Sequence, residues 1–320
     1  MNRTIGLLCA VTVLIFAPNL PFLVDGVLGA TGSDAMKHVW SQWLVVHQLQ
    51  SPDGIALDTH LIHHPSGGSF FSLDTFNALL GLPFRLVFSA VTAYNLVLMA
   101  NLFLAAVCGA YLARLLTEDR WAHTLAGTGF AFSAWVLSFP VASGVSETAV
   151  FWPIPLIILM AHKSWTEPGG RYPVATGVLL SLQGMACWSH GITAGLLLLC
   201  MFGYSVKQSP TAWKQDERWR RIAMLLGTAL LVTIPGYLAI SGTVSADDAI
   251  KTRTLSLFHS APIGPLEALE TNNMAISDFF AMGGWGLRTA EVGTDRLMYA
   301  ANPGWVLMVL SLLAWKRNRN

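Results

Sequence analysis

Residues Thr92–Ala113 read TAYNLVLMANLFLAAVCGAYLA, an apolar stretch without a charged side chain. A helix needs about 20 mostly apolar residues to cross the hydrocarbon core of a bilayer, and this stretch is long enough. Seven further apolar segments follow the same pattern: Thr4–Leu23, Trp121–Phe139, Thr148–Ala161, Tyr172–Cys187, His190–Val206, Ile222–Ser241 and Pro303–Trp315. The sequence therefore predicts an all-α, polytopic membrane protein with about eight transmembrane helices. A soluble protein with a buried helical core is the alternative.

The composition of the whole chain supports this class. Of 320 residues, 53% are hydrophobic and 12% are charged, whereas about 25% of the residues of a soluble domain are charged. The 19 basic and 18 acidic residues nearly cancel. This hydrophobic, weakly charged composition excludes a disordered chain and a nucleic-acid binder that relies on a strong basic field, and it is atypical of a soluble enzyme. We expect residues 1–320 to form a single integral-membrane domain without a nucleic-acid partner.

The distribution of charge predicts the orientation. If the N-terminus is cytoplasmic and each segment crosses once, 13 basic and 5 acidic residues lie inside, against 6 basic and 13 acidic outside. This agrees with the positive-inside rule. It requires that Thr75–Val91, which contains Pro83 and Arg85, lie at the interface instead of crossing. The first segment has a second interpretation, as a cleaved signal peptide with Arg3 as its basic region.

This topology leaves two long outer loops, residues 25–74 and 242–302. In the first, the apolar residues recur at helical spacing after Ser33, a favourable N-cap: Val39, Trp40, Trp43, Val46 and Leu49. The pattern predicts an amphipathic juxtamembrane helix from Asp34 to about Gln50. Chemistry is therefore expected at the outer face, where the long polar loops lie.

The candidate catalytic residues are acidic side chains at this face. Asp34 begins the predicted helix, where the helix dipole stabilises its ionised form, and His38 follows one turn later on the same face. Asp34 is either a helix cap or a general base. Glu147 and His190 lie in short outer turns on the same side of the membrane.

His38, His190 and further polar residues are candidates for substrate binding. His63 and His64 lie near Asp58 and precede Pro65-Ser66-Gly67-Gly68. Imidazole and carboxylate groups bind divalent metals, imidazolium binds phosphate, and a hydrogen-bonded loop is equally consistent. The spacing matches no strong metal motif, so a divalent metal stays possible and no residue is assigned as its ligand. Lys37 and Arg85 are cations that would neutralise a leaving phosphate.

Several short motifs follow one another in an order that resembles a known family. They are Gly32-Ser33-Asp34, His38, Trp40, Trp43, His64-Pro65-Ser66-Gly67-Gly68, Leu79–Pro83, Ala93-Tyr94-Asn95-Leu96, Gly109-Ala110-Tyr111-Leu112-Ala113-Arg114 and Ala131-Phe132-Ser133. Over about residues 1–210 this order resembles bacterial polytopic membrane glycosyltransferases of the GT-C superfamily. Such enzymes take a sugar from a polyprenyl-phosphate donor.

The resemblance implies an activity, a location and two site residues. It implies sugar transfer to an acceptor at the periplasmic or extracellular face of a bacterial inner (plasma) membrane. Asp34 matches the acidic residue of the family's first outer loop, a general base, and Glu147 matches a second acidic position. Because the resembled enzymes have more spans and often a soluble C-terminal domain, the resemblance implies a member shortened at its C-terminus, with a possible partner subunit.

Two other functions stay open. A lipid or solute transporter or flippase would carry ionisable residues within its spans and broken helices at the midplane, whereas the predicted spans are almost free of charge. A non-catalytic membrane subunit derived from the same family is the other alternative, motivated by the short C-terminus.

Overall fold

The computed structural model describes residues 1–29, 34–51, 58–59, 68–69, 74–142, 144–211 and 216–245. These residues are helical except for connecting turns and a two-residue antiparallel pair, β1 (Asp58–Thr59) and β2 (Gly68–Ser69). The all-α prediction is confirmed. His63, His64, the last predicted segment Pro303–Trp315 and all but the start of the second long loop lie outside the described residues.

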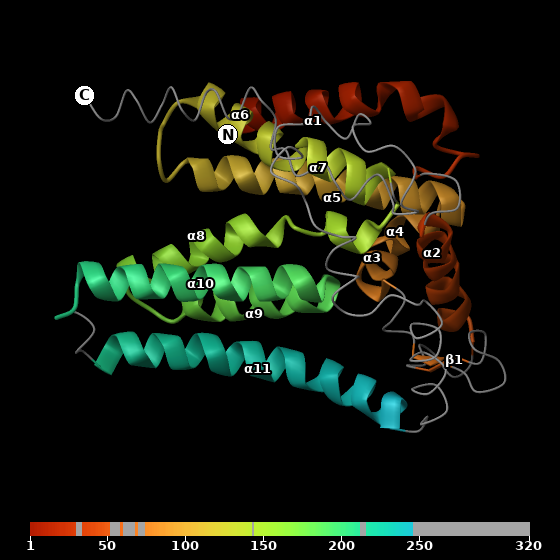
Figure 1. Cartoon of the computed structure of the whole chain (residues 1–320). Helices are drawn as coiled ribbons and strands as arrows, with labels where there is room; N and C mark the ends of the chain where they lie inside the picture. Colours follow the sequence, from red (N-terminus) through yellow and green to blue (C-terminus); the bar gives the residue numbers. More distant parts are fainter. Residues whose placement is uncertain are drawn as a thin grey trace, which may run out of the picture.

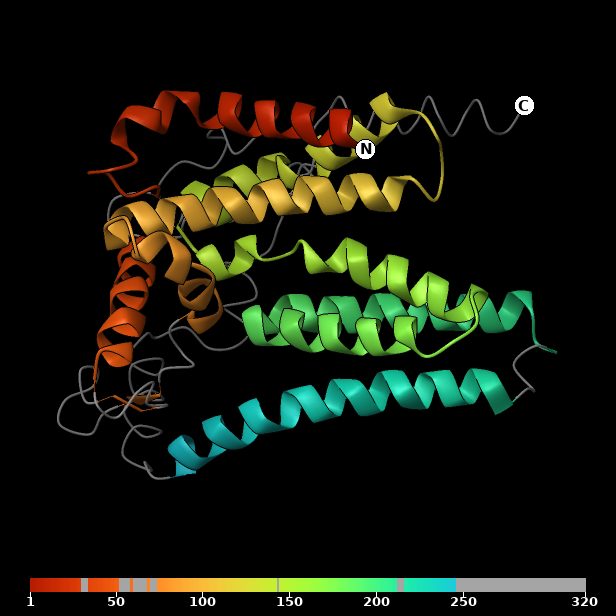
Figure 2. The ribbon, with the colours of Figure 1, turned by 180° about the vertical axis from the view of Figure 1, so that it is seen from behind.

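Most of the helices lie roughly parallel in a layered bundle (Figure 1). In chain order they are α1 (Asn2–Phe16), η1 (Ala17–Phe22), α2 (Ala35–Leu49), α3 (Thr75–Leu80), α4 (Leu82–Arg85), α5 (Ala90–Ala113), α6 (Arg120–Ala131), α7 (Ala134–Val136), η3 (Leu137–Ala142), η4 (Ser146–Ala149), α8 (Pro153–Thr166), α9 (Arg171–Ala186), α10 (Trp188–Gln208) and α11 (Asp216–Ser245). In both views α1, α5 and α6 form one group, α8–α11 a second, and α2–α4 lie at one end (Figure 2).

Three helical stretches among the described residues are long and apolar enough to cross a membrane. The first is Asn2–Phe22, which comprises α1 and η1. The other two are Ala90–Ala113 and Trp188–Gln208. Large apolar side chains such as Leu116 and Leu231 are exposed on the surface of the bundle, as expected for contact with lipid. The structure is therefore compatible with a membrane protein, whereas the number of about eight spans stays a prediction.

One predicted segment, Trp121–Phe139, is not a single helix. Helix α6 ends at Ala131, and after a break at Phe132 and Ser133 the chain continues as the short α7 and the wider π-turn η3. Pro140 lies inside η3. Because proline has no N–H group and its ring clashes with the preceding turn, a regular α-helix cannot continue through it.

The segment Thr75–Val91 folds as the sequence predicts, without a spanning helix. It forms α3 and α4, which are only six and four residues long and meet at Gly81. Beside them α2 matches the predicted amphipathic helix closely. It begins at Ala35, with Asp34 at the N-cap, whereas Ser33 was the predicted N-cap and lies outside the described residues.

The core is centred on α5, against which α1 and α6 pack. Tyr94, Leu98 and Leu102 of α5 are fully buried and share a cluster with Leu8 and Phe16 of α1. The contact with α6 depends on Gly127, where an added Cβ atom would overlap the carbonyl oxygen of Ala106. The absence of a side chain thus lets the two backbones approach closely.

Gly127→Ala is expected to destabilise the protein by about 1–3 kcal/mol, because a methyl group there forces α5 and α6 apart. The effect should appear as a lower melting temperature of the purified protein in detergent. Gly203→Ala on α10 is the matched control, since a Cβ atom there meets no atom within 4 Å. Equal melting temperatures for the two variants would contradict the close approach.

The ends of the helices lie at the two ends of the bundle in the arrangement that the predicted topology requires. The start of α1 and the α5–α6, α8–α9 and α10–α11 connections lie at one end of the bundle, whereas α2, α3 and η4 lie at the other (Figures 1 and 2). The first end carries most of the described basic residues: Arg3, Arg114, Arg120, Lys163, Arg171, Lys207, Arg218, Arg220 and Arg221. We call it the basic end, and its cytoplasmic orientation stays a prediction.

Candidate functional site

The candidate site lies at the opposite end, where α2 packs beside α3 and η4. Helix α2 presents Lys37 and His38, with Asp34 at its N-cap. Asp74 precedes α3, and Glu147 belongs to η4. Three segments that are far apart in the sequence thus bring five ionisable side chains together.

His38 is the centre of this cluster. Its side chain is 1% exposed, with Nδ1 2.9 Å from Oδ2 of Asp74 and Nε2 2.8 Å from Oε2 of Glu147. At these distances each ring nitrogen of His38 faces one carboxylate, so the ring lies between two acidic side chains. The imidazole ring lies nearly parallel to the ring of Tyr94, with 6.4 Å between their centroids.

Asp74 is held by its neighbours in an unusual backbone conformation. It is the only non-glycine residue with positive φ among the described residues, at φ 52° and ψ 44°. Its Oδ2 accepts hydrogen bonds from Nδ2 of Asn77, at 3.0 Å, and from the Ser146 hydroxyl. A left-handed backbone conformation costs free energy in a residue other than glycine, and such residues cluster at functional sites. The hydrogen bonds from Asn77 and Ser146 therefore hold the Asp74 carboxylate in place.

A polar network extends from the cluster into the bundle. Asn77 also donates to the carbonyl oxygen of Ser146, at 3.0 Å, and its Oδ1 accepts a bond of 2.7 Å from Asn101. Asn101 in turn accepts a bond of 3.1 Å from the indole N–H of Trp152. Helices α3 and α5 and the N-cap residue of α8 are thereby connected to the site, because buried amides require hydrogen-bond partners.

Lys37 connects the two acidic residues that the sequence singled out. Its Nζ lies 3.4 Å from Oδ2 of Asp34 and 3.7 Å from Oε1 of Glu147. Asp34 is 60% exposed and Glu147 is 28% exposed. The site therefore has an open edge at Asp34 and a closed interior at His38, with Glu147 between them.

The charges of the cluster change the pKa values of two members. Burial lowers the pKa of His38, but the contacts with Asp74 and Glu147 outweigh it and raise the pKa from 6.5 to about 9. Burial raises the pKa of Glu147, but His38 and Lys37 more than compensate and lower it below 4.5. At neutral pH His38 is therefore an imidazolium and Glu147 a carboxylate.

The stability of the protein is expected to fall as the pH rises from about 6.5 to about 9. The raised pKa of His38 stabilises the fold fully below the unfolded pKa of 6.5, and this contribution is lost as the pH passes the folded pKa of about 9. Each tenfold change in proton affinity corresponds to at most about 1.4 kcal/mol of stability. Melting temperatures measured across this range should decline in the wild type. His38→Gln should flatten the decline, and an equal slope in both proteins would contradict this origin.

Three side chains of the cluster could hold a divalent metal. His38, Asp74 and Glu147 each offer one ligand atom, and these atoms lie within 4.8 Å of one another. The donor set of one imidazole and two carboxylates suits Zn²⁺ or Mn²⁺. Buried atoms without a hydrogen-bond partner are also present, on the His38 ring, at Oδ1 of Asp74 and at Oε2 of Glu147. The residues therefore fit a metal, although a proton on His38 satisfies the same charges.

The structure brings four of the predicted residues together and places two elsewhere. Asp34, Lys37, His38 and Glu147 meet in the cluster around the His38 ring. Arg85 donates a bond of 2.6 Å to the carbonyl oxygen of Phe88, in its own turn.

His190 lies in the first turn of α10 and makes no ion pair with the three carboxylates of the cluster, Asp34, Asp74 and Glu147. Its Nδ1 is 3.4 Å from the carbonyl oxygen of Val150, and its ring contacts Phe151.

Asp74 is the site residue that the sequence does not predict. It precedes Thr75 at the start of a short helix, so the sequence shows only a loop boundary there. Its approach to His38 depends on the left-handed backbone and on bonds from Asn77 and Ser146, none of which has a sequence signature.

Comparisons with protein-family models, with curated proteins and with solved structures find no match to this chain. The function of the chain must therefore be inferred from the geometry and chemistry of the site itself.

Proposed function

We propose that the chain is a membrane glycosyltransferase that moves a sugar from a polyprenyl-phosphate donor to an acceptor at the outer face of the membrane. The observation that carries the proposal is the bridge of Lys37 between Asp34 and Glu147. Lys37 and the two carboxylates lie at one end of a bundle whose exposed apolar side chains can contact lipid. Such a site can meet a donor whose tail stays in the bilayer.

The proposed chemistry uses the open edge of the site. The oxygen of the acceptor hydroxyl attacks the anomeric carbon of the donor sugar, and Asp34 accepts the proton of that hydroxyl. The bond from that carbon to the phosphate oxygen breaks, and polyprenyl phosphate leaves with the bonding electrons. Lys37 lies near enough to neutralise the leaving phosphate. A positioned general base of this kind contributes about 10²–10⁴-fold to the rate.

Glu147 has a different role in this proposal. Because its pKa is lowered, it is a weaker base than a carboxylate whose pKa is near the working pH. Through its contacts with His38 and Lys37, Glu147 can hold the ammonium group of Lys37 beside Asp34. The buried pair of His38 and Asp74 then fixes Glu147, so these two are positioning residues.

A divalent metal is a second element of the proposal. Held by His38, Asp74 and Glu147, it would supply a Lewis acid for the donor phosphate. Because the ligand nitrogen must lose its proton before it binds, the affinity for Mn²⁺ should rise by up to about tenfold per pH unit until the pKa of His38, about 9. Calorimetric titration between pH 6 and pH 9 measures this. His38→Ala should abolish the binding, and a pH-independent affinity would exclude His38 as a ligand.

The activity is tested with the purified full chain in proteoliposomes. Labelled polyprenyl-phosphate sugars are supplied together with candidate hydroxyl acceptors, and the release of polyprenyl phosphate is expected to require both the chain and an acceptor. Movement of labelled lipid or sugar across the bilayer without release would instead favour the transporter. No turnover by the chain alone, but turnover with a co-purified subunit, would favour the non-catalytic component.

A further inference from the structure

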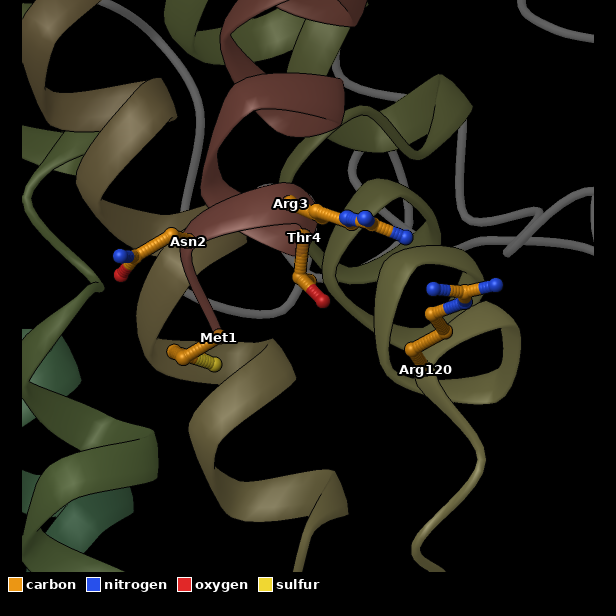
Figure 3. Close-up of a pocket in the computed structure, with 5 residues that line it drawn as sticks. All are labelled: Met1, Asn2, Arg3, Thr4 and Arg120. Carbon is orange, nitrogen blue, oxygen red and sulfur yellow. The ribbon is translucent and has the colours of Figure 1, made fainter.

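A second polar site lies at the basic end, away from the cluster around His38. A hollow of about 400 Å³ there is lined by Met1, Asn2, Arg3, Thr4 and Arg120. Figure 3 shows the first turn of α1 facing the first turn of α6, with the guanidinium groups of Arg3 and Arg120 on the same side. Two cations from different helices thus border one space.

Neither guanidinium is neutralised within the described part of the chain. Arg3 and Arg120 make no ion pair with a described carboxylate. The neighbouring Asp119 is occupied as the N-cap of α6, where it accepts a bond of 3.0 Å from the backbone N–H of Trp121. The hollow therefore carries positive charge that a bound anion would compensate.

Thr4 provides an independent indication of a ligand. The residue is 2% exposed, and its hydroxyl makes no hydrogen bond to another described residue. Figure 3 shows the hydroxyl pointing into the space between Met1 and Arg120. The hydroxyl is therefore available to donate a hydrogen bond to an oxygen of a ligand in the hollow.

We propose that this hollow binds the phosphate group of an anionic lipid. Arg3 and Arg120 pair with the phosphate oxygens, and the Thr4 hydroxyl donates a hydrogen bond to one of them. Trp121, next to Arg120, is 61% exposed, as is typical of tryptophan at the level of the headgroups. Because α1 and η1 together are long enough to span a bilayer, the first turn of α1 lies where lipid phosphates are abundant, and basic pockets between helices bind such headgroups.

The experiment is native mass spectrometry of the full chain in detergent, titrated with phosphatidylglycerol, phosphatidylcholine or soluble glycerol phosphate. Phosphatidylglycerol is expected to bind most tightly. Arg3→Gln with Arg120→Gln should weaken it about 25-fold, at about fivefold for each lost charge. Thr4→Val, which keeps both charges, should weaken it about five- to tenfold by loss of one hydrogen bond to a charged group.

The control removes two arginines from the same end of the bundle. Arg171→Gln with Arg220→Gln changes two exposed side chains that lie near Glu167 and Glu217, and it should weaken lipid binding less than about twofold. An equal loss in this control would overturn the site, as would equal binding of phosphatidylcholine. Competition by glycerol phosphate at the lipid's own concentration would overturn the lipid assignment and identify a soluble phosphate compound.

Discussion

Replacing His38 with alanine is expected to lower the free energy of unfolding by about 3–5 kcal/mol, the range for breaking a buried ion pair by removing one partner. His38 separates two carboxylates, at 2.9 Å from Asp74 and 2.8 Å from Glu147. Its loss leaves the buried Asp74 without its cation and leaves a cavity beside Tyr94. Both effects destabilise the same end of the bundle, because α2 and η4 meet through this side chain.

The measurement is unfolding of the purified protein in detergent, followed by tryptophan fluorescence. His47→Ala on the same helix is the matched control. His47 is exposed and stacks on Trp43, so its loss should cost no more than about 1 kcal/mol. The triple variant His38→Ala, Asp74→Asn and Glu147→Gln should recover part of the stability, because no carboxylate is then left unpaired. A triple variant less stable than His38→Ala would show that the loss comes from packing and not from charge.

The helix that carries this site could be predicted, but the partners of its side chains could not. The apolar spacing from Val39 to Leu49 locates α2 to within a residue at each end, because helical periodicity is a local property. The same spacing places Asp34 beside His38, whereas the structure turns Asp34 to the open edge and pairs it with Lys37. Which way His38 points is decided by Asp74 and Glu147, and such long-range pairing leaves no local pattern.

Apolarity likewise predicts that a segment is buried in protein or lipid, but not where its helix breaks. The segment Trp121–Phe139 is mostly apolar, yet α6 ends at Ala131, and the chain that follows forms the short α7 and the π-turn η3, which contains Pro140. The segment Thr148–Ala161 begins in the 3₁₀ turn that holds Glu147, so α8 starts only at Pro153. These breaks allow the turn before α8 to reach α2, where Lys37 lies between Asp34 and Glu147.

Asp34→Asn is expected to reduce sugar transfer by about 10²–10⁴-fold while leaving the stability within about 0.5 kcal/mol of the wild type. Asparagine has the size of aspartate but cannot accept the proton of the acceptor hydroxyl. The side chain is 60% exposed, and its ion pair with Lys37 is a surface contact that contributes little to folding. The loss should appear in kcat, since the proton moves in the chemical step.

Two further variants separate a base from a residue that only holds the site together. Asp25→Asn is the matched control, because Asp25 is exposed at the same end of the bundle, and it should transfer sugar at the wild-type rate. Glu147→Gln should lower both the rate and the stability, because Glu147 contacts His38 and Lys37. If Asp34→Asn is fully active while Glu147→Gln is folded and inactive, the base is Glu147 and the open edge is not the reacting edge. If both are folded and fully active, transfer does not occur at this cluster, and the assignment of the catalytic site to these residues fails.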